Sequence, residues 1–200
     1  MQRFTEAILR VGDGRGFVAE IPSRNQKWLE RVVITAAHCL PTLPPAHVGA
    51  GLEDTTFFNL LGPLDGETNT AAECYFADPV ADIALLGAPD NQELSEECDR
   101  YDTLVEDADT LALAPMDPTL PVRLCDLNRL WFGAKLNPNV HHKVWVFRTA
   151  RHEIEAGMSG SPIIQEGKAI GVLSIGPYGP NPLLTHDLPA RVFSKIRKRA

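Results

Sequence analysis

Residues 31–39 read Arg-Val-Val-Ile-Thr-Ala-Ala-His-Cys, a short β-branched run that leads into a histidine and a cysteine. The run at 31–35 predicts a strand, because β-branched residues fit a half-buried pleated surface. His38 follows closely, and a histidine with an ordinary pKa of about 6.5 can serve as a general base near neutral pH. A lone histidine behind a strand is usually a packed or exposed residue, so its meaning depends on the rest of the chain.

An aspartate and a serine elsewhere complete a pattern with His38. Residues 81–86 read Ala-Asp-Ile-Ala-Leu-Leu, so Asp82 opens an apolar run, where a partly buried carboxylate needs a partner such as an imidazole N–H. Residues 157–162 read Gly-Met-Ser-Gly-Ser-Pro, and glycines around a serine predict a tight turn with exposed backbone N–H groups. We therefore predict that His38, Asp82 and Ser159 form a catalytic triad.

Other residues compete for two of these roles. Asp65 and Asp78 are alternative carboxylates to Asp82. His186 and Asp187 form a second candidate pair, but adjacent residues point apart on most backbones, so we prefer the first set.

The sequence predicts neither a metal site nor a cofactor. His141 and His142 have no third ligand at a matching spacing, so we expect surface or strand positions for both. Acidic residues crowd between positions 90 and 109 without the glycine and spacing of a calcium loop, which indicates a solvated, partly helical linker. The four cysteines, at 39, 74, 98 and 125, are widely spaced, so we expect free thiols.

The order histidine, aspartate, serine along the chain is that of chymotrypsin and not that of the α/β-hydrolases. Segments 35–39, 82–86 and 157–162 resemble the three motifs of the trypsin/chymotrypsin family of serine peptidases, especially its bacterial, disulfide-poor members. The resemblance spans roughly residues 14–193, although the motifs themselves occupy a small part of it.

This resemblance implies an all-β fold of two six-stranded β-barrels with the active site in the cleft between them. Short predicted strands at 17–21, 83–86, 144–147, 162–164 and 169–175, separated by glycine and proline, agree with that class. We expect an N-terminal barrel in residues 1–100 and a C-terminal barrel in residues 101–200. A short helix over residues 188–196 is expected to close the chain.

The resemblance also implies further site residues. The backbone N–H groups of Gly157 and Ser159 would form the oxyanion hole. A substrate-lining strand would carry Ser174, Ile175 and Gly176, with Ser174 near the triad aspartate.

The specificity pocket is predicted by counting. In the trypsin-like branch the residue six before the nucleophile lies at the base of this pocket, and here it is Glu153. A carboxylate there favours Lys or Arg in the substrate. A small or apolar preference is the alternative, because the disulfide that shapes this loop in secreted relatives has no counterpart here.

Two departures from the family pattern bear on control. No cysteine precedes Cys39, so the usual bridge behind the histidine is missing. Met158 stands where zymogen-activated members carry the acidic residue that pairs with a freed N-terminus, and no activation cleavage sequence occurs near Met1. The sequence therefore does not predict a secreted digestive zymogen.

Charge and hydropathy limit the partners. The formal net charge is −7, which gives no electrostatic reason to bind nucleic acid or anionic lipid. No segment has the apolar length of a signal peptide core or a membrane span, so we expect a cytoplasmic protein that does not bind membranes.

The predicted function is a serine endopeptidase that acts on a protein or peptide substrate. One alternative is a binding or signalling module with a peptidase fold, silent or gated by a regulatory protein partner. Another is an esterase that uses the same triad.

Overall fold

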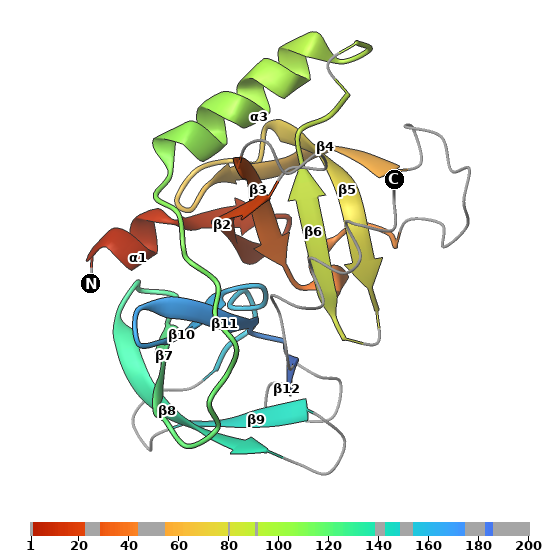
Figure 1. Ribbon diagram of the computed structural model, residues 1–200. Helices are drawn as coiled ribbons and strands as arrows, with labels where there is room; N and C mark the ends of the chain where they lie inside the picture. Colours follow the sequence, from red (N-terminus) through yellow and green to blue (C-terminus); the bar gives the residue numbers. More distant parts are fainter. Residues whose placement is uncertain are drawn as a thin grey trace.

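The computed structural model describes residues 2–22, 29–43, 55–79, 81–90, 92–138, 143–148, 154–174 and 183–185. These residues form two β lobes, one above the other in Figure 1. Within this part of the chain, no helix combines the length and the hydropathy that a bilayer span requires.

The first lobe is a closed barrel with strand order β1-β2-β3-β6-β5-β4. Its strands are β1 (Ile8–Val11), β2 (Gly14–Pro22), β3 (Leu29–Thr35), β4 (Thr56–Pro63), β5 (Thr70–Asp78) and β6 (Ile83–Gly87). All pairs in it are antiparallel. A short 3-10 helix, η1 (Ala37–Cys39), follows β3 directly.

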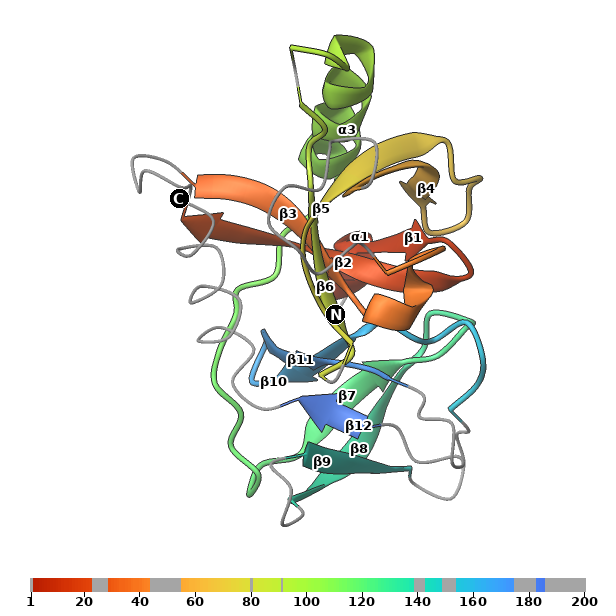
Figure 2. The same cartoon turned by 90° about the vertical axis from the view of Figure 1, so that its right-hand side faces the viewer.

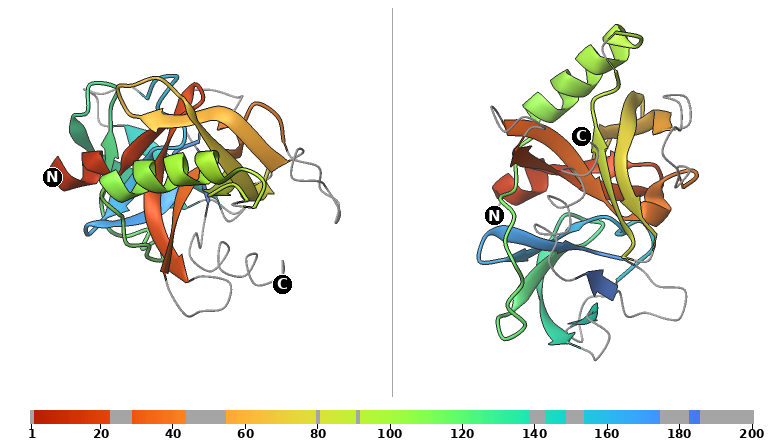
Figure 3. Two further views of the ribbon diagram at one scale, coloured as in Figure 1. Left: turned by 90° about the horizontal axis from the view of Figure 1, so that it is seen from above. Right: turned by 45° about the vertical axis from the view of Figure 1, so that its right-hand side comes forward.

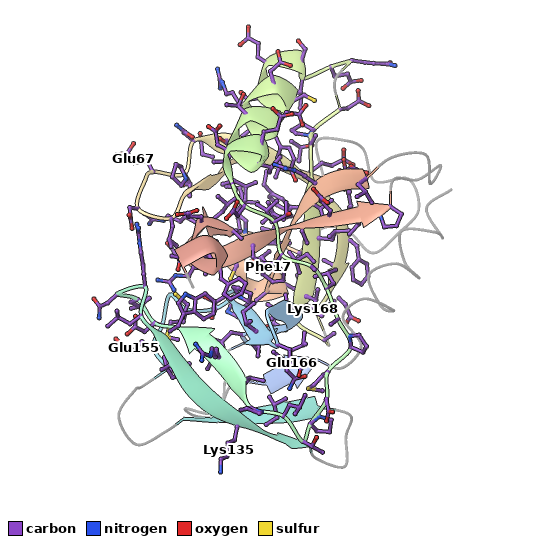
Figure 4. The ribbon with its side chains drawn as sticks, turned by 60° about the vertical axis from the view of Figure 1, so that its left-hand side comes forward. Phe17, Glu67, Lys135, Glu155, Glu166 and Lys168 are labelled. Atoms are coloured by element: carbon purple, nitrogen blue, oxygen red, sulfur yellow. The ribbon has the colours of Figure 1, made fainter. Side chains whose placement is uncertain are left out.

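Successive side chains of β2 and β3 point to opposite faces of the sheet, so the two strands contribute to two buried clusters. Val18 and Val33 pair across the two strands and pack inside the barrel. Phe17 and Ile34 also pair, but they point to the other face and pack against the second lobe. Figure 4 shows Phe17 between the two lobes. One strand pair thus supplies both the barrel core and the surface on which the second lobe docks.

The acidic segment forms a helix, α3 (Ser95–Asp107), that covers the first barrel on the side away from the second lobe (Figure 1; Figure 3, left). Its buried residues are Cys98, Tyr101 and Val105. The Tyr101 hydroxyl lies 3.2 Å from the Arg31 carbonyl oxygen on β3. Arg31 Nη1 in turn donates to the carbonyl oxygens of Val105, at 2.8 Å, and Glu106, at 3.1 Å. These bonds satisfy carbonyl groups that the end of a helix leaves open.

The second lobe is a six-stranded sheet of order β11-β10-β7-β8-β9-β12. Its strands are β7 (Val122–Cys125), β8 (Trp131–Pro138), β9 (Lys143–Arg148), β10 (Pro162–Gln165), β11 (Lys168–Val172) and β12 (Leu183–Thr185). The connection from α3 pairs with both lobes, because Leu111 bridges to Ala19 and Leu113 bridges to Ala169.

The two lobes share a continuous apolar interface. One buried cluster combines Phe17, Ile34 and Leu85 of the barrel with Ile164 and Val172 of the sheet. The N-terminal helix α1 (Gln2–Glu6) also reaches the sheet, seen beside β1 and β2 in Figure 2. Phe4 packs edge-on against Trp131, and Trp131 Nε1 donates to Thr5 Oγ1 at 2.9 Å.

The predicted all-β class is confirmed: the first predicted six-stranded barrel is closed, and the described residues of the second predicted barrel form a six-stranded sheet. The closing helix expected at 188–196 lies outside the described residues. The division at residue 100 stays a prediction, and helix α3 spans that position.

Candidate active site

The pairing of β3 with β6 brings His38 and Asp82 together. Thr35, the last residue of β3, pairs with Ala84 near the start of the antiparallel β6. The residues just after β3 and just before β6 therefore lie at the same end of the barrel. His38 Nδ1 lies 2.7 Å from Asp82 Oδ2, and the His38 backbone N donates to Asp82 Oδ1 at 3.0 Å.

Asp82 occupies a turn with an unusual backbone conformation. Its φ is +54°, in the left-handed region that aspartate and asparagine tolerate better than most residues. Asp78 Oδ1 accepts a hydrogen bond from the Ala81 backbone N at 2.9 Å, within the same turn. Asp78, one competitor for the triad role, thus supports the turn that presents Asp82. The other, Asp65, forms an ion pair with Arg129.

Hydrogen bonds around Asp82 keep it ionised. Ser174 Oγ donates to Asp82 Oδ2, the oxygen that also faces His38, and this agrees with the expected position of Ser174. Burial raises the pKa of Asp82. The hydrogen bonds from His38 and Ser174 together lower it by a larger amount, so the pKa lies below its ordinary value. The hydrogen bond to Asp82 raises the pKa of His38, against the effect of its burial.

Ser159 lies in a turn that both lobes hold in place. Gly160 N donates to the Leu173 carbonyl oxygen at 2.7 Å within the second lobe. Arg15 N, from β2 of the barrel, donates to the Ser159 carbonyl oxygen at 2.7 Å. Gly160 has a φ of +84°, and a Cβ there would overlap the Arg15 carbonyl oxygen, so glycine is required beside Ser159.

Met158 anchors the same turn from inside the second lobe. Its side chain is fully buried in the cluster with Val122, Leu124 and Phe132. The Glu155 backbone N lies 3.3 Å from Met158 Sδ, and Met158 N donates to the Glu155 carbonyl oxygen at 3.2 Å. Met158 is therefore an apolar anchor of this turn.

Two backbone N–H groups of this turn, those of Gly157 and Ser159, have no hydrogen-bond partner among the described residues. Gly157 has a φ of +92° and lines the cavity described next. Donors fixed in this way cost no reorganisation when charge develops on a bound carbonyl.

A cavity of about 610 Å³ joins the two halves of the site. His38 and Ser159 both line it, from the barrel and from the second lobe respectively. The His38 side chain is 44% exposed, whereas Ser159 is only 6% exposed. A substrate in this cavity would meet the imidazole and the hydroxyl together.

Arg15 is a site-supporting residue that the sequence did not reveal. Its guanidinium is buried and donates to the carbonyl oxygens of Asp126, at 2.9 Å, and Cys125, at 3.3 Å, on the β7–β8 turn. Thr35 Oγ1 donates to the Arg15 carbonyl oxygen at 2.6 Å. Because Arg15 N also binds the Ser159 carbonyl, this one residue links β2, β3, the β7–β8 turn and the Ser159 turn.

All four cysteines are free, as expected. Gly14 occupies the place of a bridge partner for Cys39, because a Cβ on Gly14 would lie 3.6 Å from Cys39 Cβ. Burial raises the pKa of Cys39 to about 11, so its thiol is protonated at neutral pH and is a poor nucleophile.

This geometry predicts that Gly14→Cys forms a disulfide with Cys39, since bridged Cβ atoms are typically about 3.8 Å apart. The closed loop should raise the free energy of unfolding by at most roughly 3 kcal/mol, or about 5–10 °C in Tm. The gain is an upper value because the new Cβ would also approach the Ser159 carbonyl oxygen to 2.8 Å. Thermal melting with and without reductant measures it, with Gly14→Ala as the control. Equal Tm under both conditions would contradict the prediction.

Several predicted residues lie outside the described part of the chain. They are Glu153, Ile175 and Gly176 of the expected substrate-binding set, and His141, His142, His186 and Asp187 of the alternatives. The specificity predicted from Glu153 therefore stays a prediction. Among the described residues, no cluster of side chains is suited to hold a metal ion.

A scan against protein-family models and a search of curated proteins each give no match. Solved structures do match. The Rv3671c protease of M. tuberculosis, in its inactive form, is 15% identical over 98% of this chain and 89% of its own, with a TM-score of 0.54. A human pathogenic astrovirus serine protease is 16% identical over 93% and 92%, with a TM-score of 0.53. The serine protease domain of the Sesbania mosaic virus polyprotein is 12% identical over 90% and 88%, with a TM-score of 0.54. These similarities show that the chain has the chymotrypsin-like fold of serine proteases.

Proposed function

We propose that this chain is a serine endopeptidase that cleaves peptide bonds through an acyl-enzyme on Ser159. The observation that carries the proposal is the bond between His38 Nδ1 and Asp82 Oδ2, at 2.7 Å. With Nδ1 engaged, Nε2 is the nitrogen left to receive a proton. Ser159 lines the same cavity as His38 and is the hydroxyl suited to give that proton up.

In the proposed mechanism, Ser159 Oγ attacks the carbonyl carbon of the scissile peptide while His38 Nε2 takes the hydroxyl proton. The imidazolium then gives this proton to the leaving amine as the C–N bond breaks. In the second half of the reaction, His38 Nε2 takes a proton from water, and the water oxygen attacks the ester carbon. The bond from that carbon to Ser159 Oγ then breaks, His38 returns the proton to Oγ, and the carboxylic acid product leaves. Asp82 stays ionised throughout, because its hydrogen bonds hold its pKa below the ordinary value.

The N–H groups of Gly157 and Ser159 receive the oxyanion of both tetrahedral intermediates in this mechanism. Removal of one such donor in a related chemistry costs about 10²–10³ in kcat. The turn that holds the two donors is fastened through Arg15 N and Gly160 N. Oxyanion stabilisation therefore depends on contacts from both lobes.

We infer that the site needs no proteolytic activation. Met158 is packed among apolar side chains of the second lobe, so the Ser159 turn has an anchor that does not involve a charged chain terminus. The four free cysteines fit a reducing compartment such as the cytoplasm, in keeping with the resemblance to bacterial, disulfide-poor members.

Labelling with a serine-directed fluorophosphonate, followed by mapping of the labelled peptide, tests this proposal on the 200-residue chain with Met1 uncleaved. Modification at Ser159 without trimming is the expected result, and addition of reductant should leave it unchanged. A folded chain that is not labelled would favour a silent or partner-gated module. Labelling together with cleavage of simple esters but of no peptide in a proteome-derived library would favour an esterase.

The raised pKa of His38 predicts the acidic limb of the pH profile. His38 must be neutral to accept a proton, so kcat/KM should fall as the pH drops through the His38 pKa. Because Asp82 raises that pKa, the midpoint should lie above about 6.5, the ordinary value for histidine. The labelling rate measured from pH 5 to pH 9 checks this. A midpoint below 6.5 would mean that the imidazolium is not stabilised.

A further inference from the structure

The cavity beside His38 and Ser159 has a third wall that the proposed chemistry does not use. This wall is the β1–β2 turn, residues 12–14, which lines the cavity together with Ala156 and Gly157. The Asp13 carbonyl oxygen lies 3.8 Å from the point that a Cβ on Gly157 would occupy. The Asp13 backbone therefore lies beside Gly157, and both residues line the cavity.

The cavity lies on the side of the leaving group. In acyl transfer the amine that departs takes its proton from the histidine, so it must lie on the histidine side of the nucleophile. Leu40 and Pro41, which follow His38 closely in the chain, also line this cavity. The residues of a substrate that follow the cleaved bond would therefore enter this space.

Asp13 contributes a negative charge to the cavity. Among the described residues that line the cavity, Asp13 is the one carboxylate, and neither Lys nor Arg is present. Asp13 is exposed, and its carboxylate has no hydrogen bond or ion pair with any described residue. The two cations nearest to Asp13 in the chain are engaged elsewhere. Arg15 donates to the carbonyl oxygens of Cys125 and Asp126. Arg10 donates to those of Gly12 and Gly66, at 3.3 Å each.

The remaining lining suits the stem of a long cationic side chain. Leu40 and Pro41 provide apolar surface, and Gly12 and Gly14 add no side chain that would fill the space. A Lys or Arg side chain packs its methylene groups on such a surface while its charged end reaches a carboxylate. A purely apolar side chain would fit the surface but would leave Asp13 without a partner.

We propose that Asp13 makes this cavity a subsite for Lys or Arg as the first residue after the cleaved bond. This inference rests on the proposed peptidase function, and it names the substrate class on the leaving-group side. The pair would be partly exposed, so selection of about fivefold over an uncharged isostere is expected. Salt should weaken it, since exposed charges are screened.

The subsite can be tested by the competition between water and an added amine for an acyl-enzyme. This test requires no knowledge of the primary specificity. p-Nitrophenyl acetate would acetylate Ser159, and added argininamide or citrullinamide would compete with water for the acetyl group. The amine nitrogen attacks the acetyl carbon, the bond from that carbon to Ser159 Oγ breaks, and the amine proton passes through His38 to Oγ. Argininamide and citrullinamide have nearly the same shape and differ in charge, so their ratio of acetylated products reports on Asp13 alone. Reaction measured with Ser159→Ala is subtracted as background.

The wild type should prefer argininamide about fivefold, and Asp13→Asn should bring the ratio close to one. High salt should have the same effect on the wild type. Glu67→Gln is the matched control, because Glu67 is an exposed carboxylate on the β4–β5 loop that points away from the barrel (Figure 4) and does not line the cavity. Glu67→Gln should keep the wild-type ratio.

Equal partition in the wild type, or a preference that Asp13→Asn leaves unchanged, would overturn the subsite. Hydrolysis of the ester by water is measured in the same samples and reports on the catalytic site independently. If the wild type forms no acetyl-enzyme, the peptidase proposal fails and the subsite fails with it. If the acetyl-enzyme forms and turns over but shows no charge preference, only the subsite fails.

Discussion

Ser159→Ala is expected to fold like the wild type and to lose roughly a million-fold in kcat, the scale seen when a nucleophile of this kind is removed. The hydroxyl oxygen forms the bond to the substrate, so no neighbouring group can replace it. Stability should change little, because the hydrogen bond from Arg15 N goes to the Ser159 backbone carbonyl, which the substitution keeps. Hydrolysis of p-nitrophenyl acetate and of denatured casein, together with thermal melting, measures both effects.

Ser161→Ala is the matched control, two residues along the same turn. Ser161 is completely buried, and its Oγ has no hydrogen-bond partner among the described residues. Removal of an unpaired buried hydroxyl should be neutral or slightly stabilising, and activity should remain close to that of the wild type. Retained peptidase activity in purified Ser159→Ala, or an equal loss in Ser161→Ala, would show that the nucleophile has been assigned wrongly.

Strands with strong local signals were predictable from the sequence. The runs at 31–35 and 83–86 are apolar and largely uninterrupted, and they correspond to β3 and β6. The strand β5 gave no such signal, because it begins with Thr70, Ala71, Ala72 and Glu73, two of which are alanines with weak strand preference. The position of β5 in the barrel depends on its pairing with β4 and β6, and a local sequence pattern does not predict which strands pair.

The sequence of helix α3 contains a helical pattern of buried residues, but its many acidic residues dominated the interpretation. Its buried residues Cys98, Tyr101 and Val105 follow helical spacing, with one face against the barrel. The surrounding acidic residues indicated a solvated, partly helical linker. A helix is present, but solvation is correct for its outer face only. The sequence thus located the segment but understated how firmly it packs.

The structural role of Arg15 could not be read from the sequence for a physical reason. Its guanidinium binds the carbonyl oxygens of Cys125, Asp126 and Leu127, which are backbone groups that every residue carries. A buried arginine paired with a carboxylate would at least leave a charged partner to search for. The motif residues His38 and Asp82 were easier to find because their roles depend on side-chain identity.

Asp82→Asn is expected to fold and to lose about four orders of magnitude in kcat. The folded turn should survive, because asparagine tolerates the φ of +54° that Asp82 adopts. The amide oxygen can still accept the hydrogen bond from the His38 backbone N. The amide nitrogen would then face His38 Nδ1 as a donor, so Nδ1 must accept and the ring proton must move to Nε2. A protonated Nε2 cannot take a proton from Ser159.

The same substitution should also shift the pH dependence. The hydrogen bond to Asp82 is the largest cause of the raised pKa of His38, so its removal should lower that pKa and move the acidic limb of the residual activity to lower pH. A variant that is merely misfolded would lose activity without this shift. Steady-state kinetics across pH, on protein whose circular dichroism matches the wild type, separates the two cases.

Asp78→Asn is the matched control, because it changes a carboxylate to an amide in the same turn. Asp78 Oδ1 accepts a hydrogen bond from the Ala81 N–H, and an asparagine oxygen can accept it equally well, so the turn and the activity should both be kept. Both variants remove one negative charge at the β5–β6 turn, so a difference between them reports on the hydrogen bonds between Asp82 and His38 and not on the loss of charge alone. If Asp78→Asn lost activity and Asp82→Asn kept it, Asp78 would be the residue that orients His38, and the hydrogen bond at 2.7 Å would have no catalytic role.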